Sequence, residues 1–167
     1  MRKAICAALL GATVLLAGAC TPSSSTAFSV DGKVTTNNEL DSWAAACAQA
    51  FDKTSSEMQT IVLGFLVNAQ VAERIQAETG ISFSDAEREN LLRQSDTGRA
   101  MLRNPLCKEV GYGVAEYALL IDRMRITEFN AAQRRIAVVV NPRYGYWDSS
   151  SALVTGEGSL SGQAGDR

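Results

Sequence analysis

The stretch Ile136–Val140, with the sequence IAVVV, predicts where the fold closes. Arginines precede these five apolar residues and Asn141-Pro142 follows them, which is typical of a short strand buried on both faces. A strand needs a partner, because backbone donors and acceptors are not buried unpaired. The other good candidate is Ala27–Val30. We therefore expect the first and last segments of the domain to pair in a sheet.

The segments between these two strands have helical signals. Capping boxes begin at Thr36, Thr54 and Ser84, each with a glutamate three residues later, and Asn104-Pro105 is typical of a fourth helix start. Gly80 ends the second and longest helix. Arg93–Arg99 is polar and has no clear assignment, and we interpret Thr127–Arg135 as a bridge to the last strand. The predicted fold class is mainly α (α+β): a bundle of about four to five helices with a small antiparallel sheet.

Apolar residues at helical spacing predict the faces that these helices bury. Asp31-Gly32, by contrast, lies between two short β-prone pieces and predicts a tight turn. The residues expected to be buried in the first two helices are Leu40, Trp43, Ala44, Cys47, Ala50, Phe51, Met58, Ile61, Val62, Phe65, Leu66, Ala69, Ala72 and Ile75.

The amino terminus has the layout of an export signal. Two basic residues precede an apolar stretch from Ala4 to Leu16, which is too short for a transmembrane helix. Leu16-Ala17-Gly18-Ala19-Cys20 resembles the bacterial lipobox, in which the cysteine is acylated and becomes the first residue. The alternative is an ordinary signal peptide followed by an incidental cysteine. We expect residues 1–19 to be the signal, Cys20 to be the lipid anchor, and residues 20–26 to be a polar tether at the extracytoplasmic face of the cell membrane.

The composition excludes several kinds of chemistry. The 167 residues indicate one domain and include no histidine, so His-dependent triads and His-containing zinc sites are excluded. Removing residues 1–19 removes Arg2 and Lys3 and no acid, which leaves 14 basic against 18 acidic residues. A net charge of −4 argues against nucleic acid as a partner. Residues 149–167 are rich in Ser and Gly and are predicted to be disordered.

Two cysteines remain after Cys6 leaves with the signal and Cys20 is acylated. An even pair in an exported domain favours a Cys47–Cys107 disulfide, and two buried free thiols are the alternative. No other group suggests catalysis. Asp85, Glu87 and Glu89 form an acidic patch at a helix start. Asp85 and Glu89 share a helix face that could bind a cation, and the simpler interpretation is that acids in the first turn complement the helix dipole. Gly111-Tyr112-Gly113 lacks the context of a phosphate loop, and two glycines inside a helix more simply permit close packing or local bending. We expect no catalytic residue, no cofactor and no metal.

Three pieces of the chain together resemble a known family. They are Val30–Thr35 leading into a helix, Ala77–Glu87, where one helix ends and another begins, and the closing strand with Asn141–Asp148. In this order they are similar to the SurA N-terminal chaperone domain in its actinobacterial lipoprotein form, over about residues 27–148. Asp31 stands where relatives commonly carry Asn, and both residues tolerate the turn.

The resemblance implies a mainly helical domain that holds unfolded or nascent exported proteins without catalysis. Relatives often carry a parvulin prolyl-isomerase domain, for which the residues after Asp148 are too few. A second hypothesis is a lipoprotein binding or assembly module that uses the same fold for one folded partner. Five aromatic residues are candidates for the client-binding surface: Trp43, Phe51, Phe65, Tyr112 and Tyr117.

Overall fold

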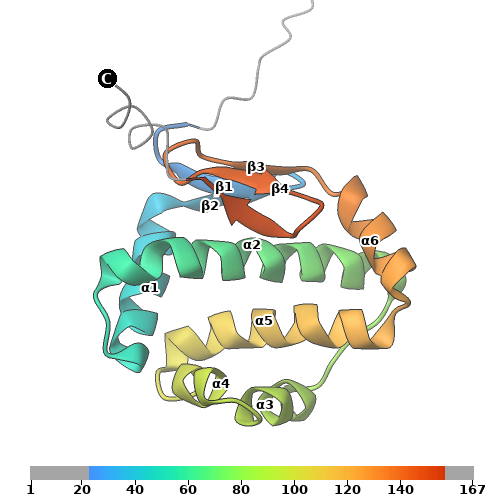
Figure 1. Cartoon of the computed structure of the whole chain (residues 1–167), viewed down its shortest axis with the longest axis horizontal. Coiled ribbons are helices and arrows are strands. Elements are labelled where there is room, and N and C mark those ends of the chain that lie inside the picture. The colour runs from blue at the N-terminus through green and yellow to red at the C-terminus, as the bar shows by residue number, and fades with distance from the viewer. Residues whose placement is uncertain (1–22, 157–167) are drawn as a thin grey trace, which may run out of the picture.

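The structure, a computed structural model, describes residues 23–156. In Figure 1 a small sheet lies at the top, α2 lies beneath it, α5 lies beneath α2, and α3 and α4 form the lowest layer. The predicted fold class is confirmed, with six helices in the described part of the chain. In order, the elements are β1 (Thr26–Val30), β2 (Lys33–Thr36), α1 (Asn37–Phe51), α2 (Ser55–Thr79), α3 (Asp85–Arg93), α4 (Asp96–Met101), α5 (Pro105–Arg123), α6 (Ile126–Arg135), β3 (Val138–Val140), β4 (Tyr146–Asp148) and β5 (Leu153–Thr155).

The predicted pairing of the two end segments is confirmed. The three-stranded sheet has the order β2-β1-β3 and is antiparallel throughout, with Phe28 opposite Val140 and Val30 opposite Val138. The prediction that the last strand is buried on both faces is wrong. β3 is an edge strand and only one of its faces packs against the core, so Val139 on the other face is 40% exposed. The strand also begins at Val138, because Ile136 ends α6 instead.

Asp31 joins the first hairpin to the last strand. Asp31 and Gly32 both have positive φ, as a two-residue hairpin turn of type I′ requires. The Asp31 amide donates to the Ala137 carbonyl, and the Asp31 carboxylate accepts from the Ala137 amide, each at 2.8 Å. The same carboxylate accepts from Arg74 Nε of α2 at 2.7 Å. These hydrogen bonds hold the pKa of Asp31 below its usual value.

We expect Asp31→Asn to lower the free energy of unfolding by about 1 kcal/mol at pH 7, because the exposed ion pair with Arg74 is lost. The folded-state pKa is lowered, so the stabilisation is complete above the unfolded pKa and is lost as the pH falls through the folded pKa. Urea unfolding at pH 7 and at pH 2 measures the free energy of unfolding at each pH, and so shows whether the difference between the variant and the unaltered protein shrinks in acid. Asp52→Asn is the control. The backbone of Asp52 also has a positive φ, and no ion pair involves this residue among the described residues. Equal losses in the two variants would contradict the assignment.

The helix boundaries follow the caps expected from the sequence. Thr36, Thr54 and Ser84 each form a complete capping box, Asn104 caps α5, and Gly80 ends α2 in the left-handed conformation. Two helical segments were not predicted. α4 begins inside the polar stretch 93–99 and continues to Met101. α6 replaces the expected bridge because its amphipathic pattern buries Phe129 and Ala132.

Most of the predicted core residues are buried, with one clear error. Ile61 is 44% exposed, because the buried face of this part of α2 is formed by Val62, Leu63 and Val67. Trp43, Phe51, Phe65 and Leu66 are only partly buried against the core. The long helix has neighbours on more than one side, so a single apolar stripe did not describe it.

The ordered domain extends beyond both predicted limits. The tether was predicted to run to residue 26, but Ser23 already hydrogen-bonds to the Thr26 amide and Thr26 begins β1. The tail was predicted to be disordered from Ser149. Instead, the Ser149 carbonyl accepts from Gln133 of α6 at 2.9 Å, and β5 pairs with β4. Val154 of this segment packs against the hydrophobic core, which the Ser-rich composition did not indicate. The signal, Cys20 and residues 157–167 lie outside the described residues.

Close helix contacts depend on a disulfide and on glycines. Cys47 of α1 and Cys107 of α5 form a disulfide, as predicted, and both are fully buried. A Cβ at Gly113 of α5 would lie 2.2 Å from Cβ of Ala69 in α2, which confirms the packing role inferred for the Gly-Tyr-Gly stretch. Among the residues that the structure describes, no helix is long and apolar enough to span a bilayer.

Candidate functional site

An open apolar cavity of about 290 Å³ lies where α3, α4 and α5 meet, and Phe65 of α2 also lines it. Phe65 of α2 and Val114 of α5 are partly buried, so they line the cavity while they remain in contact with the core. This volume lies near the lower end of the range for ligand sites, roughly 300–1,000 Å³. Its apolar lining is formed mainly by Phe65, Leu91, Leu92, Met101, Val114 and Ala118.

A second cavity of about 440 Å³ continues from the first between α3 and α5. The two cavities share Leu91, Gln94 and Ala118, so we treat them as one groove with an apolar compartment and an acidic compartment. Glu87 of α3 and Asp122 of α5 line the acidic compartment, one from each of the two helices that form its walls. No lysine or arginine lines either compartment. The groove therefore combines apolar surface with negative charge.

Two glycines allow the walls of the groove to approach each other. A Cβ at Gly98 of α4 would lie 2.0 Å from the Leu92 carbonyl oxygen, and a Cβ at Gly111 of α5 would lie 3.1 Å from Cβ of Met101. Any larger residue at Gly98 therefore displaces backbone. The short α4 helix is fixed against both of its neighbours by these contacts, and this fixes the apolar end of the groove.

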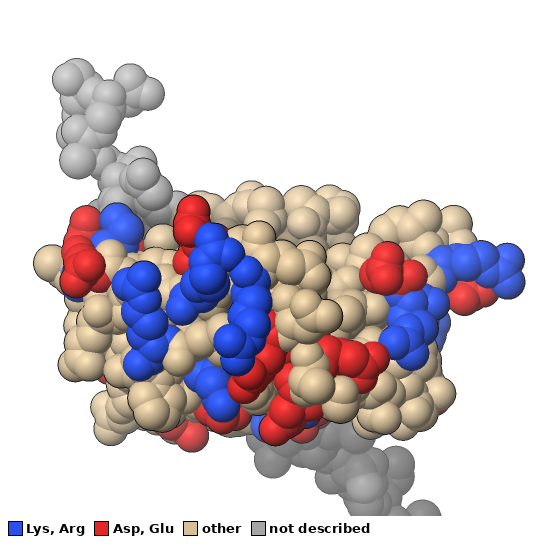
Figure 2. All heavy atoms as spheres, turned by 90° about the horizontal axis from the view of Figure 1, so that it is seen from below, with Lys and Arg blue, Asp and Glu red and all other residues tan. Residues whose placement is uncertain are grey.

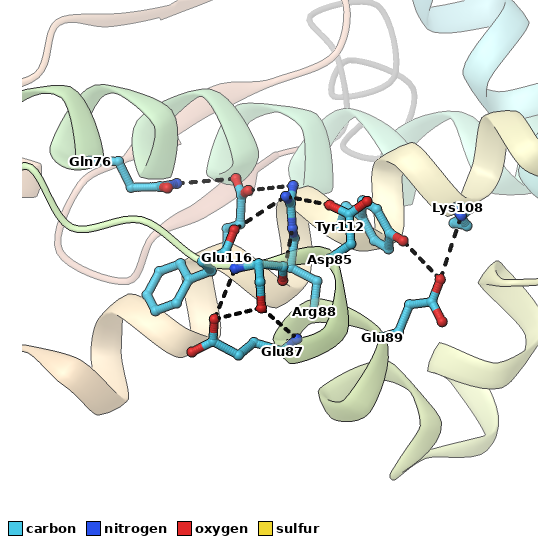
Figure 3. Close-up of polar contacts among 10 residues, drawn as sticks. Gln76, Asp85, Glu87, Arg88, Glu89, Lys108, Tyr112 and Glu116 are labelled. Atoms are coloured by element: carbon cyan, nitrogen blue, oxygen red, sulfur yellow. Dashed lines mark hydrogen bonds and ion pairs between the residues drawn. The ribbon is translucent and has the colours of Figure 1, made fainter.

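Arg88 joins α3 to α5 through a cluster of polar contacts (Figure 3). Its guanidinium donates to Glu116 of α5 at 2.8 Å and to Asp85 at 2.7 Å, and it lies 4.8 Å from the centre of the Tyr112 ring. Gln76 of α2 donates to the second oxygen of Glu116 at 3.1 Å. The Arg88 and Glu116 side chains are 22% and 18% exposed, and the contacts of this polar cluster join three helices.

The predicted client-binding residue Tyr112 belongs to this polar cluster and not to the groove. Tyr112 is only 7% exposed, and its hydroxyl donates to Glu89 at 2.9 Å. Hydrogen bonds from Arg93 and Tyr112 lower the pKa of Glu89. The acidic patch of Asp85, Glu87 and Glu89 is thus divided among three roles. Asp85 pairs with Arg88 of the same helix, and Glu89 joins α3 to α5 through Tyr112 and Lys108. Glu87 caps α3 and lines the groove.

The other aromatic candidates lie at several separate places. Tyr117 donates to Gln133 of α6 at 2.6 Å and packs edge-to-face on Phe129; burial raises its pKa to about 12. Phe51 lies at the end of α1 beside a polar depression, and Trp43 packs against the core in α1. Only Phe65 lines the groove, so the five residues do not form one surface.

The end of the closing strand is fixed by side-chain hydrogen bonds and packing. The Asn141 amide group donates to the Thr26 carbonyl at 2.8 Å, and Tyr144 donates to Asn37 at 3.0 Å. Arg143 lies over the Tyr144 ring and donates to its hydroxyl. Trp147 contributes packing alone, because its indole nitrogen has no partner among the described residues.

A separate polar cleft of about 560 Å³ lies between the first hairpin and α2. Its charged side chains are paired with each other: Lys33 with Glu73, and Asp31 with Arg74. The charges of these four lining residues sum to zero, so the cleft has no excess charge for a charged ligand. Within residues 23–156, no group of three or more acidic or cysteine side chains is placed to hold a metal ion.

The face that contains α3 and α4 carries both signs of charge. Figure 2 shows Lys and Arg side chains bordering Asp and Glu side chains, rather than a continuous basic field. Arg93 pairs with Glu89, and Arg99 pairs with Asp96. Proteins that bind nucleic acid rely on a basic footprint, which this face does not present.

No protein-family description, curated protein or solved structure matches this chain. The groove must therefore be interpreted from its own chemistry. Sequence reasoning identified Phe65 but missed Leu91, Met101, Val114 and Ala118 as parts of one site. Each of them looks like an ordinary residue of an amphipathic helix, and only the packing of four helices brings them together.

Proposed function

We propose that this chain is a membrane-anchored, extracytoplasmic, chaperone-like lipoprotein that binds apolar segments of unfolded exported polypeptides without catalysis. The observation that carries the proposal is the open apolar compartment between α3, α4 and α5. Exposed apolar surface on a folded domain is typical of interaction sites. A compartment of this size accommodates one or two large side chains and leaves the rest of a bound chain outside.

Two features of the sequence support the location and the class. The lipobox-like segment ending at Cys20 favours acylation, which retains the domain at the membrane where exported chains emerge. The resemblance to the SurA N-terminal domain favours chaperone activity, and the absence of histidine removes the commonest general acid–base group from the chain. The disulfide fits an oxidising compartment.

The groove is tested by filling it. We expect the Thr21–Arg167 fragment to delay aggregation of several unrelated unfolded proteins, and we expect Ala118→Arg to remove most of this effect. Ala118 is exposed and lines both compartments, so an arginine there occupies the groove at little cost to the helix. Light scattering of a reduced, unfolding client measures the delay, and circular dichroism shows that the variant remains folded.

Ala77→Arg is the matched control, because Ala77 is an exposed helical alanine that lines the polar cleft. It should leave the delay unchanged. Loss of the effect in Ala77→Arg but not in Ala118→Arg would move the site to the cleft. If the unaltered fragment delays no client, general chaperone activity is excluded, and the module for one folded partner becomes the better hypothesis. Prolyl-isomerase turnover by the fragment would contradict the non-catalytic assignment.

A further inference from the structure

We infer that the groove selects client segments in which a large apolar side chain lies two or three residues from a lysine or arginine. This inference rests on the proposed function and names the class of segment that the groove takes. It follows from the order of the two compartments, which places an apolar pocket next to a negatively charged one.

The helix positions fix the distance between the two compartments. Asp122 is four residues after Ala118 on α5, and Glu87 is four residues before Leu91 on α3, so each acid lies one turn from an apolar lining residue. One turn of helix is about 5.4 Å. The step from the middle of the apolar compartment to the acids is therefore roughly one to two turns, which an extended peptide covers in two or three residues at about 3.3 Å each.

The negative charge at this end is only partly neutralised. Arg123 pairs with Glu87 at 3.2 Å, and Glu87 also accepts from Ser84 in its capping box. Asp122 takes part in no ion pair or hydrogen bond within the described residues, and it is exposed. Asp122 is therefore the carboxylate that remains for a cation on a bound segment, and an acidic segment meets repulsion there.

The contrast with the rest of the surface supports this assignment. On the rest of α3 and α4 several charges are paired within the same helix, as in Arg93 with Glu89 and Arg99 with Asp96, and Arg88 also pairs with Glu116 of α5. At the acidic compartment, Asp122 has no ion-pair partner among the described residues and lies next to the apolar cavity. The pattern fits a basic–apolar segment, and it fits an uncharged apolar segment less well.

The test uses the mature, full-length protein held in phosphatidylcholine nanodiscs and three labelled peptides. Each peptide has one phenylalanine in a Gly/Ser background, with lysine, glutamine or glutamate three residues away. Fluorescence anisotropy should show the lysine peptide binding roughly 2- to 5-fold tighter than the glutamine peptide, as a solvent-exposed charge pair allows, with the glutamate peptide weakest. The preference should shrink in 0.5 M salt, where surface charges are screened.

Asp122→Asn should abolish the preference for lysine while the glutamine peptide binds as before. Glu109→Gln is the matched control, because Glu109 is an exposed acid on α5 outside the groove. Equal binding of the three peptides, or a lysine preference that survives in Asp122→Asn, would overturn the inference and leave the apolar site intact. If no peptide binds and Ala118→Arg does not change the delay of client aggregation, the groove is not the binding site and the proposed function fails with it.

Discussion

Replacing both Cys47 and Cys107 with alanine is expected to lower the free energy of unfolding by about 3–4 kcal/mol. The disulfide closes a loop with a sequence separation of 60 residues, for which the chain-entropy relation gives roughly 4 kcal/mol. Both side chains are fully buried against the core, so the substitutions also remove packing contacts. Urea unfolding at 25 °C, followed by circular dichroism, measures the change.

The unaltered protein in a reducing agent is the control for this prediction. Reduction should reproduce most of the loss in the unaltered protein and should have no effect on the double variant. Intact-mass measurement of the unaltered protein should show a gain of two hydrogens on reduction. Two thiols that alkylate freely in the unreduced, unfolded protein would contradict the disulfide.

Gly113→Ala is expected to lower the free energy of unfolding by about 2 kcal/mol, although alanine favours a helix over glycine. The new Cβ would lie 2.2 Å from Cβ of Ala69 and 3.3 Å from its Cα, so α2 and α5 must move apart. Overpacking of this kind typically costs roughly 1–3 kcal/mol. The gain in helix propensity, about 0.5–1 kcal/mol, offsets only part of this cost.

Gly64→Ala is the matched control within the same helix pair. Apart from its own turn of helix, no atom of the described residues lies within 4 Å of a Cβ placed at Gly64. Only the gain in helix propensity remains, so the variant should be more stable by about 0.5–1 kcal/mol. In a double-mutant cycle, Ala69→Gly should recover much of the loss in Gly113→Ala, because it removes the clashing methyl group. Equal effects of Gly113→Ala and Gly64→Ala would show that the two helices do not approach as closely as described.

The parts of the fold that could be predicted are those that depend on local chemistry. The three capping boxes, the Gly80 terminus and the Asp31-Gly32 turn each depend on a few adjacent residues, and the structure confirms them. The pairing of β1 with β3 was also predicted, because a chain with two good strand candidates leaves little choice of partner.

The errors arise where distant segments decide the outcome. Val139 was expected to be buried, but its exposure depends on which strand takes the central place in the sheet, and β1 takes it. The Ser-rich stretch after Asp148 looked disordered, yet Leu153–Thr155 pairs with β4. Tyr112 looked suitable for a client surface, because the sequence does not show that Glu89 and Arg88 lie beside it.

The early start of the folded domain has a consequence for its orientation. Ser23 already contacts β1, so a lipid attached at Cys20 is separated from the fold by a link that spans at most about 10 Å. Figure 1 shows the sheet and the groove-forming helices at opposite ends of the molecule. If Cys20 is acylated, as proposed, the sheet is the side of the domain nearer the lipid headgroups. The helices α3 and α4, which form part of the groove, then lie on the side of the domain far from the bilayer.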